Sequence, residues 1–581
     1  MVKKNNKLLN RKFYKYLIPG ILIALLLRFT SVMDGVIIGN RLGSMCLAST
    51  GLSISALYIS QLPGYALGVG SAIACSRLIG NRKIDEASKV NSISIITTII
   101  LSLLIALLAY PLSEPIAKFI AGGKDEYINY MKIYIFSYWV TSPIIGLLLY
   151  YSNIMAVDNH PILSTAMVLV SSALKLLFML ITLYSFNIND LNLGMYLASF
   201  STAFGALISL VVVIFYLKSK KRLLKFSFKI DKPLLHLKEA IVSGMAAILT
   251  YLLTSMQLLV IDLNLSRALN DEEMLIYGVI TNMVFVVELF TAGVIQLIPS
   301  LVGVLYGEED YRGVYNLSKK MFLICEMISL IIMSIFLIYP KLLLDMFGYQ
   351  PIVSNDYIYN FSYKAIRIYS LIYIFNQANM FGITYYPSTN KPFIANISVI
   401  LRTILLSLLF VIPLSYNNGL IGYSIANVLN ESLTFIIILI IIYIYKLKKK
   451  DLKTVFLIPD ISKICDLDFT ISTDKERIEG KEKIYEYLYK KIDSAVLLDV
   501  TNMFDNITKR IQDSGYLNKN NYIDINLKET SDYFILCIRD DGKILDDVNK
   551  EDNKIAVSYI RCINLNNTII KIKKEEIKNG N

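Results

Sequence analysis

The chain has 581 residues, of which 55% are hydrophobic and 18% are charged, and its formal net charge is +12. A mean hydropathy of +0.53 is too high for a soluble protein of this length. These values exclude a soluble globular protein and predict an integral membrane protein.

Twelve apolar stretches follow one another along the chain, each near the roughly 20 residues that a helix needs to cross a bilayer. The first six are expected near residues 15–38, 48–76, 90–112, 129–152, 162–185 and 193–217, and the second six near 238–262, 275–300, 320–345, 364–386, 393–414 and 420–446. The predicted fold is an all-α polytopic membrane protein with twelve transmembrane helices in two six-helix lobes, residues 1–232 and 233–450. A small α+β cytoplasmic domain is expected over residues 451–581, called the tail below.

The second set of stretches repeats landmarks of the first at a nearly constant offset, as expected of two copies of one bundle. The repeated landmarks are VMD (32–34) and VID (260–262), Gly80 and Gly307, Asn159 and Asn390, and Pro161 and Pro392. An even number of spans per copy keeps both copies in the same orientation. The sequence therefore predicts parallel repeats about an axis along the membrane normal, with a cavity between the lobes near the midplane.

Basic residues gather in segments that lie on one side of the membrane if the span count holds. They are the N-terminus (Lys3, Lys4, Lys7, Arg11, Lys12), the loop after the second span (Arg77, Arg82, Lys83), the middle loop (Lys218 to Lys225) and the segment after the twelfth span (Lys446 to Lys450). The positive-inside rule makes this side cytoplasmic, so both termini are expected in the cytoplasm of a bacterial-type plasma membrane. These basic runs are topology signals, and no nucleic-acid partner is expected.

Ionisable residues at membrane depth are costly and usually face a cavity or a partner. Asp34 in the first span is the main candidate for exchanging a proton or an ion, and its alternative role is a structural acid near the outer interface. Lys175 in the fifth span must snorkel, lose its proton or pair with an acid, and pairing with Asp34 is the expected outcome.

A second set of polar residues inside the spans is predicted to line the substrate pathway. This set contains Gln61, Gln257, Asp262, Glu288, Asn376 and Asn379. Asp262 and Glu288 are the repeat counterparts of Asp34 and Gln61, although Asp262 could instead lie in an outer loop beside Arg267. The asparagines could contact substrate or form interhelical hydrogen bonds, which are the commoner use of such residues.

The strings SVMDGVIIGNRLG, GLSIS, GYALGVGSA and RLIGNRKIDEA resemble the first two helices of multidrug and toxic compound extrusion (MATE) transporters. The later VDNHP and GVIQLIPSLVGVLYGEEDYRGV look like the turn before span five and like span eight with its following loop, so the resemblance covers about residues 10–446. It implies the MATE fold, alternating access, and export of organic cations or amphipathic compounds against an inward flow of protons or sodium. The family's first-span aspartate falls on Asp34.

One departure from the family pattern concerns span five, where many bacterial members have an asparagine and an aspartate one turn later. Lys175 and Met179 occupy these positions here. We expect Lys175 to act as a tethered cation that pairs with Asp34 when neither substrate nor proton occupies it. The span-seven glutamate of sodium-linked members has no obvious match either, which favours protons over sodium.

The tail after KLKKK is expected to contain helices over residues 475–513 and strands at YIDINLK, YFILCIRDDGK and NNTIIKIKK. It is similar to the histidine-kinase-like (GHKL) ATPase domain in its anti-sigma-factor form. The resemblance places the magnesium-binding asparagine at Asn506 and the adenine-recognising turn at Asp540 and Gly542. Asn502 replaces the usual water-activating acid and the glycine-rich lid is missing, so the tail is expected to regulate or to bind a partner rather than hydrolyse ATP. The DDG turn alone also fits an ordinary hairpin.

The predicted function is therefore a cation-coupled antiporter, with no catalytic residues, no metal and no cofactor. Its expected partners are a small-molecule substrate, a coupling proton or sodium ion and the lipid bilayer. Two alternatives stay open: a membrane-anchored sensor whose tail binds a cytoplasmic protein, and a flippase for lipid precursors. The sequence contains no phosphate-binding P-loop motif that would indicate a primary pump.

Overall fold

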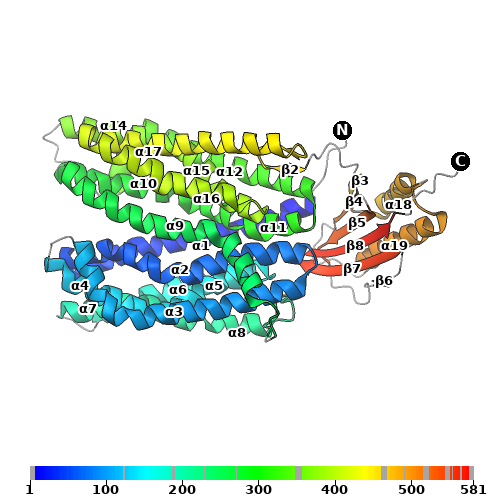
Figure 1. The fold of residues 1–581 in the computed structure, drawn as a ribbon, viewed down its shortest axis with the longest axis horizontal. Coiled ribbons are helices and arrows are strands. Elements are labelled where there is room, and N and C mark those ends of the chain that lie inside the picture. Colours follow the sequence, from blue (N-terminus) through cyan, green and yellow to red (C-terminus); the bar gives the residue numbers. More distant parts are fainter. Residues whose placement is uncertain are drawn as a thin grey trace. The chain divides into compact units, whose positions relative to one another are not determined.

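A computed structural model describes residues 7–121, 125–185, 190–227, 229–269, 271–346, 356–459, 467–489, 491–513, 522–530, 532–542, 550–551, 554–562 and 565–574. The chain divides into two compact units (Figure 1). The larger unit comprises Leu17–Glu309 and Ser318–Lys449 and is helical. The smaller unit comprises Met1–Tyr16, Asp310–Leu317 and Lys450–Asn581, and it contains the sheet of the tail.

The first half of the helical chain contains eight α-helices and one π-helical turn in the described residues. They are α1 (Lys7–Leu42), α2 (Ser44–Gly80), α3 (Ile84–Ala121), α4 (Asp125–Val140), α5 (Ser142–Val157), α6 (Pro161–Leu180), η1 (Ile181–Ser185), α7 (Leu191–Ser209) and α8 (Val211–Lys218). The second half repeats this pattern of long helices and short breaks. It contains α9 (Pro233–Ala268), α10 (Asp271–Gln296), α11 (Ile298–Gly307), α12 (Tyr311–Ile338), α13 (Pro340–Met346), α14 (Asp356–Ser370), α15 (Ile372–Ser388), α16 (Pro392–Ile400), η2 (Leu401–Leu405) and α17 (Leu406–Lys448).

Among the described residues, eight helices are long and apolar enough to cross a membrane, or nine if one bent pair counts as a single span. The long α17 contains parts of two expected spans, and Asn418 and Gly419 interrupt its helical geometry between them. Gly419 has φ +54° and ψ −138°, a conformation that residues with a Cβ rarely adopt. The many-helix membrane architecture is confirmed, while the count of twelve spans and the lobe boundary at residue 232 remain predictions.

The expected fourth span is broken. The structure has two helices there, α4 and α5, which bend by 57° at Thr141. Pro143 lies at the start of α5, where its missing N–H costs nothing, whereas in the interior of a continuous helix it would remove a hydrogen bond and clash with the preceding turn.

Two turns of the first half recur in the second with the same backbone geometry. After α2, Arg82 has φ +65°, and after α11 its counterpart Glu309 has φ +57°. After α5, Asn159 has φ +63°, and after α15 its counterpart Asn390 has φ +60°. Left-handed backbone is uncommon outside glycine, so its recurrence at matched positions supports two copies of one architecture.

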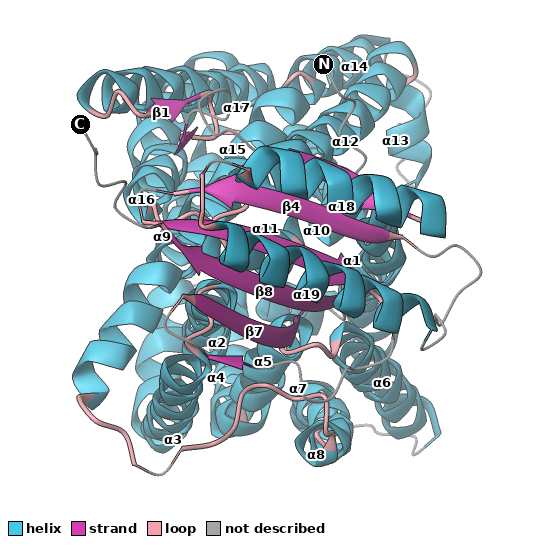
Figure 2. Ribbon diagram, turned by 90° about the vertical axis from the view of Figure 1, so that its right-hand side faces the viewer, coloured by secondary structure: helices cyan, strands magenta, loops and turns pink. Residues whose placement is uncertain are grey.

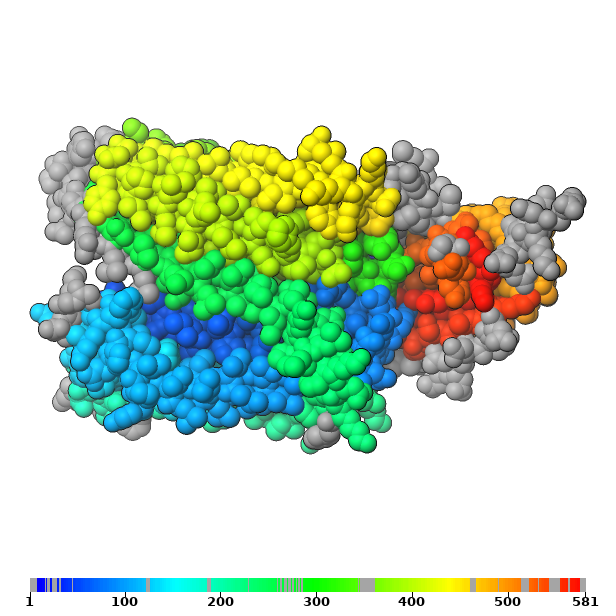
Figure 3. All heavy atoms as spheres, viewed as in Figure 1, coloured from blue at the N-terminus to red at the C-terminus, as the bar shows by residue number. Residues whose placement is uncertain are grey.

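The two halves meet closely where α2 packs against α9 and α11. A Cβ on Gly80 would collide with the Val304 carbonyl oxygen and would lie 2.9 Å from the Cα of Gly307, the repeat counterpart of Gly80. A Cβ on Gly70 would collide with the Ala240 carbonyl oxygen. In the space-filling view, the green surface around α9 borders the blue surface of the first half (Figure 3). Small residues allow this approach of backbones, as is typical of membrane helices.

Arg77 links the halves beside these glycines. Its guanidinium donates to Asn390 Oδ1 at 2.7 Å and to Ser243 Oγ at 2.9 Å. Both acceptors belong to the second half, so the end of α2 is held to α9 and to the turn after α15.

The tail forms a six-stranded antiparallel sheet in the order β3-β4-β5-β8-β7-β6, with α18 and α19 lying over one face (Figure 2). The elements are β1 (Leu452–Lys453), β2 (Ile458–Pro459), β3 (Leu467–Ile471), α18 (Asp474–Leu488), α19 (Ser494–Asp513), β4 (Ile523–Glu529), β5 (Tyr533–Asp540), β6 (Lys550–Glu551), β7 (Ile555–Cys562) and β8 (Leu565–Lys573). Apolar residues of both helices and the sheet form one core. The expected helices and three strands are therefore present.

Candidate functional site

In the first half, Lys175 on α6 is paired with Asp34 on α1, as the sequence predicted. Lys175 Nζ donates to Asp34 Oδ2, and both side chains are largely buried. The other carboxylate oxygen, Asp34 Oδ1, is buried and has no hydrogen-bond partner among the described residues. This oxygen is available to a proton or to a cation.

Two tyrosines of α4 border this ion pair. Tyr134 and Tyr138 both interact electrostatically with the Asp34 carboxylate, and Tyr138 accepts a hydrogen bond at 2.7 Å from Gln61 Nε2 on α2. The predicted residue Gln61 therefore bonds to a tyrosine on which the Asp34 charge acts. Four helices, α1, α2, α4 and α6, contribute side chains to this group.

The second half contains a different charged group, centred on Arg402 of η2 and Glu431 of α17. The guanidinium donates to Glu431 Oε1 from Nε at 3.0 Å and from Nη2 at 2.6 Å. The predicted residues Asn376 and Asn379 of α15 belong to this group. Asn376 Oδ1 accepts from Arg402 at 2.6 Å, and Asn379 Nδ2 donates to Glu431 Oε2 at 2.7 Å.

The remaining predicted pathway residues are Gln257, Asp262 and Glu288. Gln257 on α9 donates to Ser407 Oγ at 2.7 Å. Glu288 is half buried on α10. Asp262 lies within α9, but its side chain is outside the described residues. A role for these three residues in the substrate pathway remains a prediction.

Sequence reasoning missed Arg402, Glu431 and a further acid, Glu326 on α12. Both carboxylate oxygens of Glu326 are buried without a hydrogen-bond partner among the described residues. All three residues lie inside expected spans, so a complete survey of ionisable residues at membrane depth would have found them. The repeat leads from Asp34 to Asp262 and not to these residues.

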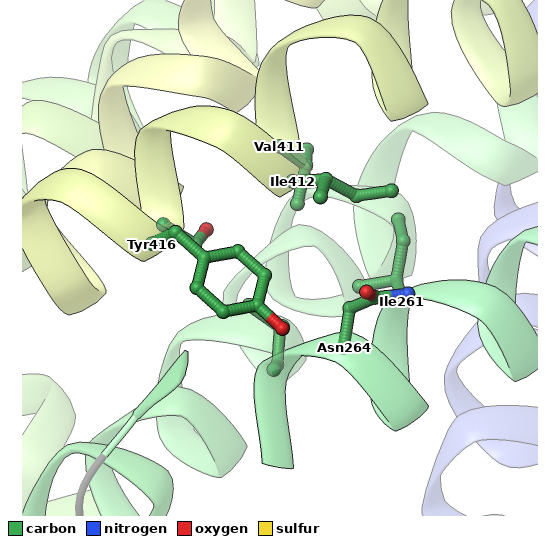
Figure 4. Close-up of a pocket in the computed structure, with 7 residues that line it drawn as sticks. Ile261, Asn264, Val411, Ile412 and Tyr416 are labelled. Carbon is green, nitrogen blue, oxygen red and sulfur yellow. The ribbon is translucent and has the colours of Figure 1, made fainter. Parts of the chain in front are cut away.

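A small pocket lies between α9 and α17 (Figure 4). It is lined by Ile261, Asn264, Leu265, Val411, Ile412, Ser415 and Tyr416, and it has almost no enclosed volume. Sites for drug-sized ligands are usually much larger. This pocket is therefore not a substrate chamber in the conformation described.

At the end of α5, the Asp158 carboxylate holds the connection between the two halves. Its Oδ2 accepts from Tyr216 Oη at 2.6 Å, and its Oδ1 accepts from the backbone N–H of Leu223 at 2.7 Å and of Leu224 at 3.2 Å. Burial raises the pKa of this carboxyl to about 7, against the opposing effect of the hydrogen bonds. A buried, titratable side chain therefore anchors the segment that joins the halves.

In the tail, Asp540 ends β5 and shapes the DDG turn. Its Oδ1 accepts from the Gly542 N–H at 2.7 Å and from Asn566 Nδ2 at 2.8 Å. Burial raises the pKa of Asp540 to about 6. The turn does not close a hairpin between neighbouring strands, because β5 pairs with β4 and β8. Asn506 is exposed on α19, and nucleotide binding by these residues remains a prediction.

The MatE family profile matches residues 19–181 and 246–417, more than half of the chain. The multidrug export protein MepA of Staphylococcus haemolyticus is 22% identical over 335 residues, which cover 58% of this chain and 72% of the relative. MepA of Staphylococcus aureus (strain MRSA252) is 24% identical over 331 residues, covering 57% of this chain and 69% of the relative.

Solved structures share the fold at lower identity. A MOP superfamily transporter from Pyrococcus furiosus gives a TM-score of 0.68 at 18% identity, over 77% of this chain and 97% of the other. The Vibrio cholerae MATE transporter VcmN gives a TM-score of 0.68 at 16% identity, over 78% of this chain and 99% of the other. With its repeated helical halves and its family match, the chain belongs to the MatE family of membrane-embedded secondary transporters and is not an enzyme.

Proposed function

We propose that the protein is a proton-coupled antiporter that exports organic cations or amphipathic compounds by alternating access. The observation that carries this proposal is the Asp34–Lys175 pair, with one carboxylate oxygen unpartnered among the described residues. The similarity to relatives named multidrug export proteins supports the substrate class.

The proposed cycle uses one carboxylate for three competing cations. Lys175 occupies Asp34 when the site is otherwise empty, a cationic substrate displaces Lys175, and a proton displaces the substrate. Because the three occupants exclude one another, inward movement of protons is coupled to outward movement of substrate. A protonated Asp34 holds Lys175 less strongly, which alters the packing of α1 against α6.

Uptake of a fluorescent cationic dye into everted vesicles tests the proposal, under an imposed pH gradient and then a sodium gradient. We expect wild-type uptake under the pH gradient and its loss in Asp34→Asn. Glu114→Gln is the matched control, because it removes an acid from an exposed ion pair of α3. Uptake driven by sodium alone would identify sodium as the coupling ion in place of the proton. Full activity of Asp34→Asn would exclude Asp34 as the coupling site.

Lys175→Met tests the tethered-cation role separately. We expect a changed pH dependence of dye uptake, because no internal cation then competes with the proton. Unchanged transport at every pH would remove Lys175 from the cycle while leaving Asp34 in it.

The alternative of a regulator acting through the tail has one supporting contact within the smaller unit. Arg539 on β5 donates from Nη1 to Asp310 Oδ2 at 2.7 Å, and both side chains are buried. Asp310 also accepts from the Gly313 N–H at 2.9 Å at the start of α12. Removal of residues 451–581 separates the candidates: an exporter should retain much of its flux, and a regulator should lose its output.

A further inference from the structure

The charged group of the second half resembles an occupied cation-binding site in which the bound cation is Arg402 of the same chain. Arg402 fills one side of the Glu431 carboxylate with two hydrogen bonds, and its Nη2 also donates to Asn376 Oδ1. Glu431, Asn376 and Asn379 are buried. The acceptors that surround the guanidinium are those that a planar organic cation with N–H donors would require.

The group is not saturated. Asn376 Nδ2 and Asn430 Oδ1 are buried without hydrogen-bond partners among the described residues. Asn430 belongs to the same group, since its Nδ2 donates to the Arg402 carbonyl oxygen at 2.8 Å. Buried polar atoms are nearly always paired, so these two atoms have unused capacity to hydrogen-bond a further group beside the ion pair.

Two features allow Arg402 to leave. It lies in the π-helical turn η2, and such turns occur frequently at functional sites. Its side chain is 17% exposed, whereas that of Glu431 is 6% exposed. The arginine therefore lies at the accessible side of the pair, and the carboxylate behind it.

We propose that Glu431 and Asn376 form a second cation-binding site, which Arg402 occupies until an organic cation with N–H donors displaces it. The inference deepens the proposed export of organic cations and rests on it for the class of ligand. Arg402 then determines specificity, because only a cation that replaces its hydrogen bonds to Glu431 Oε1 and Asn376 Oδ1 gains access.

The test is equilibrium binding of the amidinium dye DAPI to the purified full-length protein in detergent, without any ion gradient. The amidinium group reproduces the planar donors of arginine, and tetraphenylphosphonium, which has no N–H group, is the control ligand. We expect Arg402→Gln to strengthen DAPI binding by about tenfold, because the internal competitor is gone. Tetraphenylphosphonium binding should change much less.

Two further variants keep the test valid if Arg402→Gln folds poorly. The neutral double variant Arg402→Gln/Glu431→Gln should lose the gain, and Glu431→Gln alone should weaken DAPI binding below wild type. Arg367→Gln is the matched control, because Arg367 is an exposed arginine of α14 whose Nε donates to the Leu337 carbonyl oxygen at 2.9 Å.

A purely structural ion pair predicts a different result: the variants alter stability, but DAPI affinity stays within twofold or so of wild type in every folded variant. That result would overturn the proposal. Failure of the proposed function has its own signature, since gradient-driven dye uptake by the wild type would then be absent whatever the binding data show.

Discussion

The two halves of the transporter share their turns and differ in their charges. After α5 and after α15, the backbone follows the same left-handed turn at Asn159 and Asn390. Even the next side chain repeats its contact: His160 Nδ1 lies 2.5 Å from the Asp158 carbonyl oxygen, and Lys391 Nζ donates to the Thr389 carbonyl oxygen at 2.9 Å.

The ion pairs have not been kept in the same places. In both halves the basic partner follows the repeated turn, as Lys175 on α6 and Arg402 on η2. The acid lies on the first helix in one half and on the last helix in the other, as Asp34 and Glu431. Packing therefore constrains the repeated backbone. A buried charge, in contrast, needs only one nearby partner of opposite charge, which any of several helices can supply.

The largest effect is expected where the halves touch. Gly80→Leu places a side chain against the Val304 carbonyl oxygen and Gly307, so the two helices must separate. Overpacking of this kind costs about 1–3 kcal/mol or more, and here it also breaks the contact between the halves. We expect loss of dye transport and a lower melting temperature. Gly51→Leu is the control, because a Cβ at Gly51 meets nothing within 4 Å; equal behaviour of both variants would contradict the packing argument.

The next effect separates the two ion pairs. Glu431→Leu strands a guanidinium, which cannot lose its proton, and we expect a cost of about 3–5 kcal/mol. Asp34→Leu should cost less, because a stranded lysine can become neutral. Denaturant unfolding in detergent measures both. A larger loss for Asp34→Leu would reverse the ranking and show that the first pair contributes more to folding.

A third effect depends on pH and is confined to the first half. The pKa of Asp158 is raised to about 7 by burial from its ordinary value near 3.8. Between these values the folded protein retains a proton that the unfolded chain has released. Stability from this group is therefore complete below about pH 4 and is lost as the pH rises through 7, by at most about 1.4 kcal/mol per pH unit.

Melting temperatures of wild type and Asp158→Asn between pH 5 and about 8 check this prediction. The melting temperature of the wild type should fall relative to that of Asp158→Asn as the pH rises. Thr389→Val is the control, since Thr389 occupies the matching position and does not titrate. A difference that does not vary with pH would contradict the assigned pKa.

The smallest effects concern single hydrogen bonds that the halves do not share. Tyr138→Phe removes the bond from Gln61, and Ser407→Ala removes the bond from Gln257. Each should cost roughly 0.5–1.5 kcal/mol in unfolding experiments. Only Tyr138→Phe should also shift the pH dependence of dye uptake, because Tyr138 interacts with Asp34; an equal shift in Ser407→Ala would remove that distinction.

Sequence patterns were sufficient for features that depend on local chemistry or on repetition. The doubled landmarks, the tail strands and the pairing of Lys175 with Asp34 were all predictable. A lysine among apolar residues needs a partner, and Asp34 is an acid inside an expected span of the same half.

A survey of ionisable residues in the spans identifies Arg402 and Glu431, but it does not predict that they pair with each other. Arg402 and Glu431 lie on helices joined by the break at Asn418 and Gly419, and the angle of that break decides whether they meet. The repeat indicated Asp262 instead, because it preserves positions and not partners. The bend between α4 and α5 was missed for a related reason: hydropathy does not distinguish a straight span from one broken at a proline.

The contact between Gly80 and Gly307 is reciprocal. A Cβ on Gly80 would meet the Val304 carbonyl oxygen, and a Cβ on Gly307 would meet the Arg77 carbonyl oxygen. Arg77 and Val304 are separated by the same number of residues as Gly80 and Gly307, so the two obstacles are equivalent. A side chain added at either glycine therefore pushes the two halves apart, and a glycine in one half alone cannot relieve the crowding.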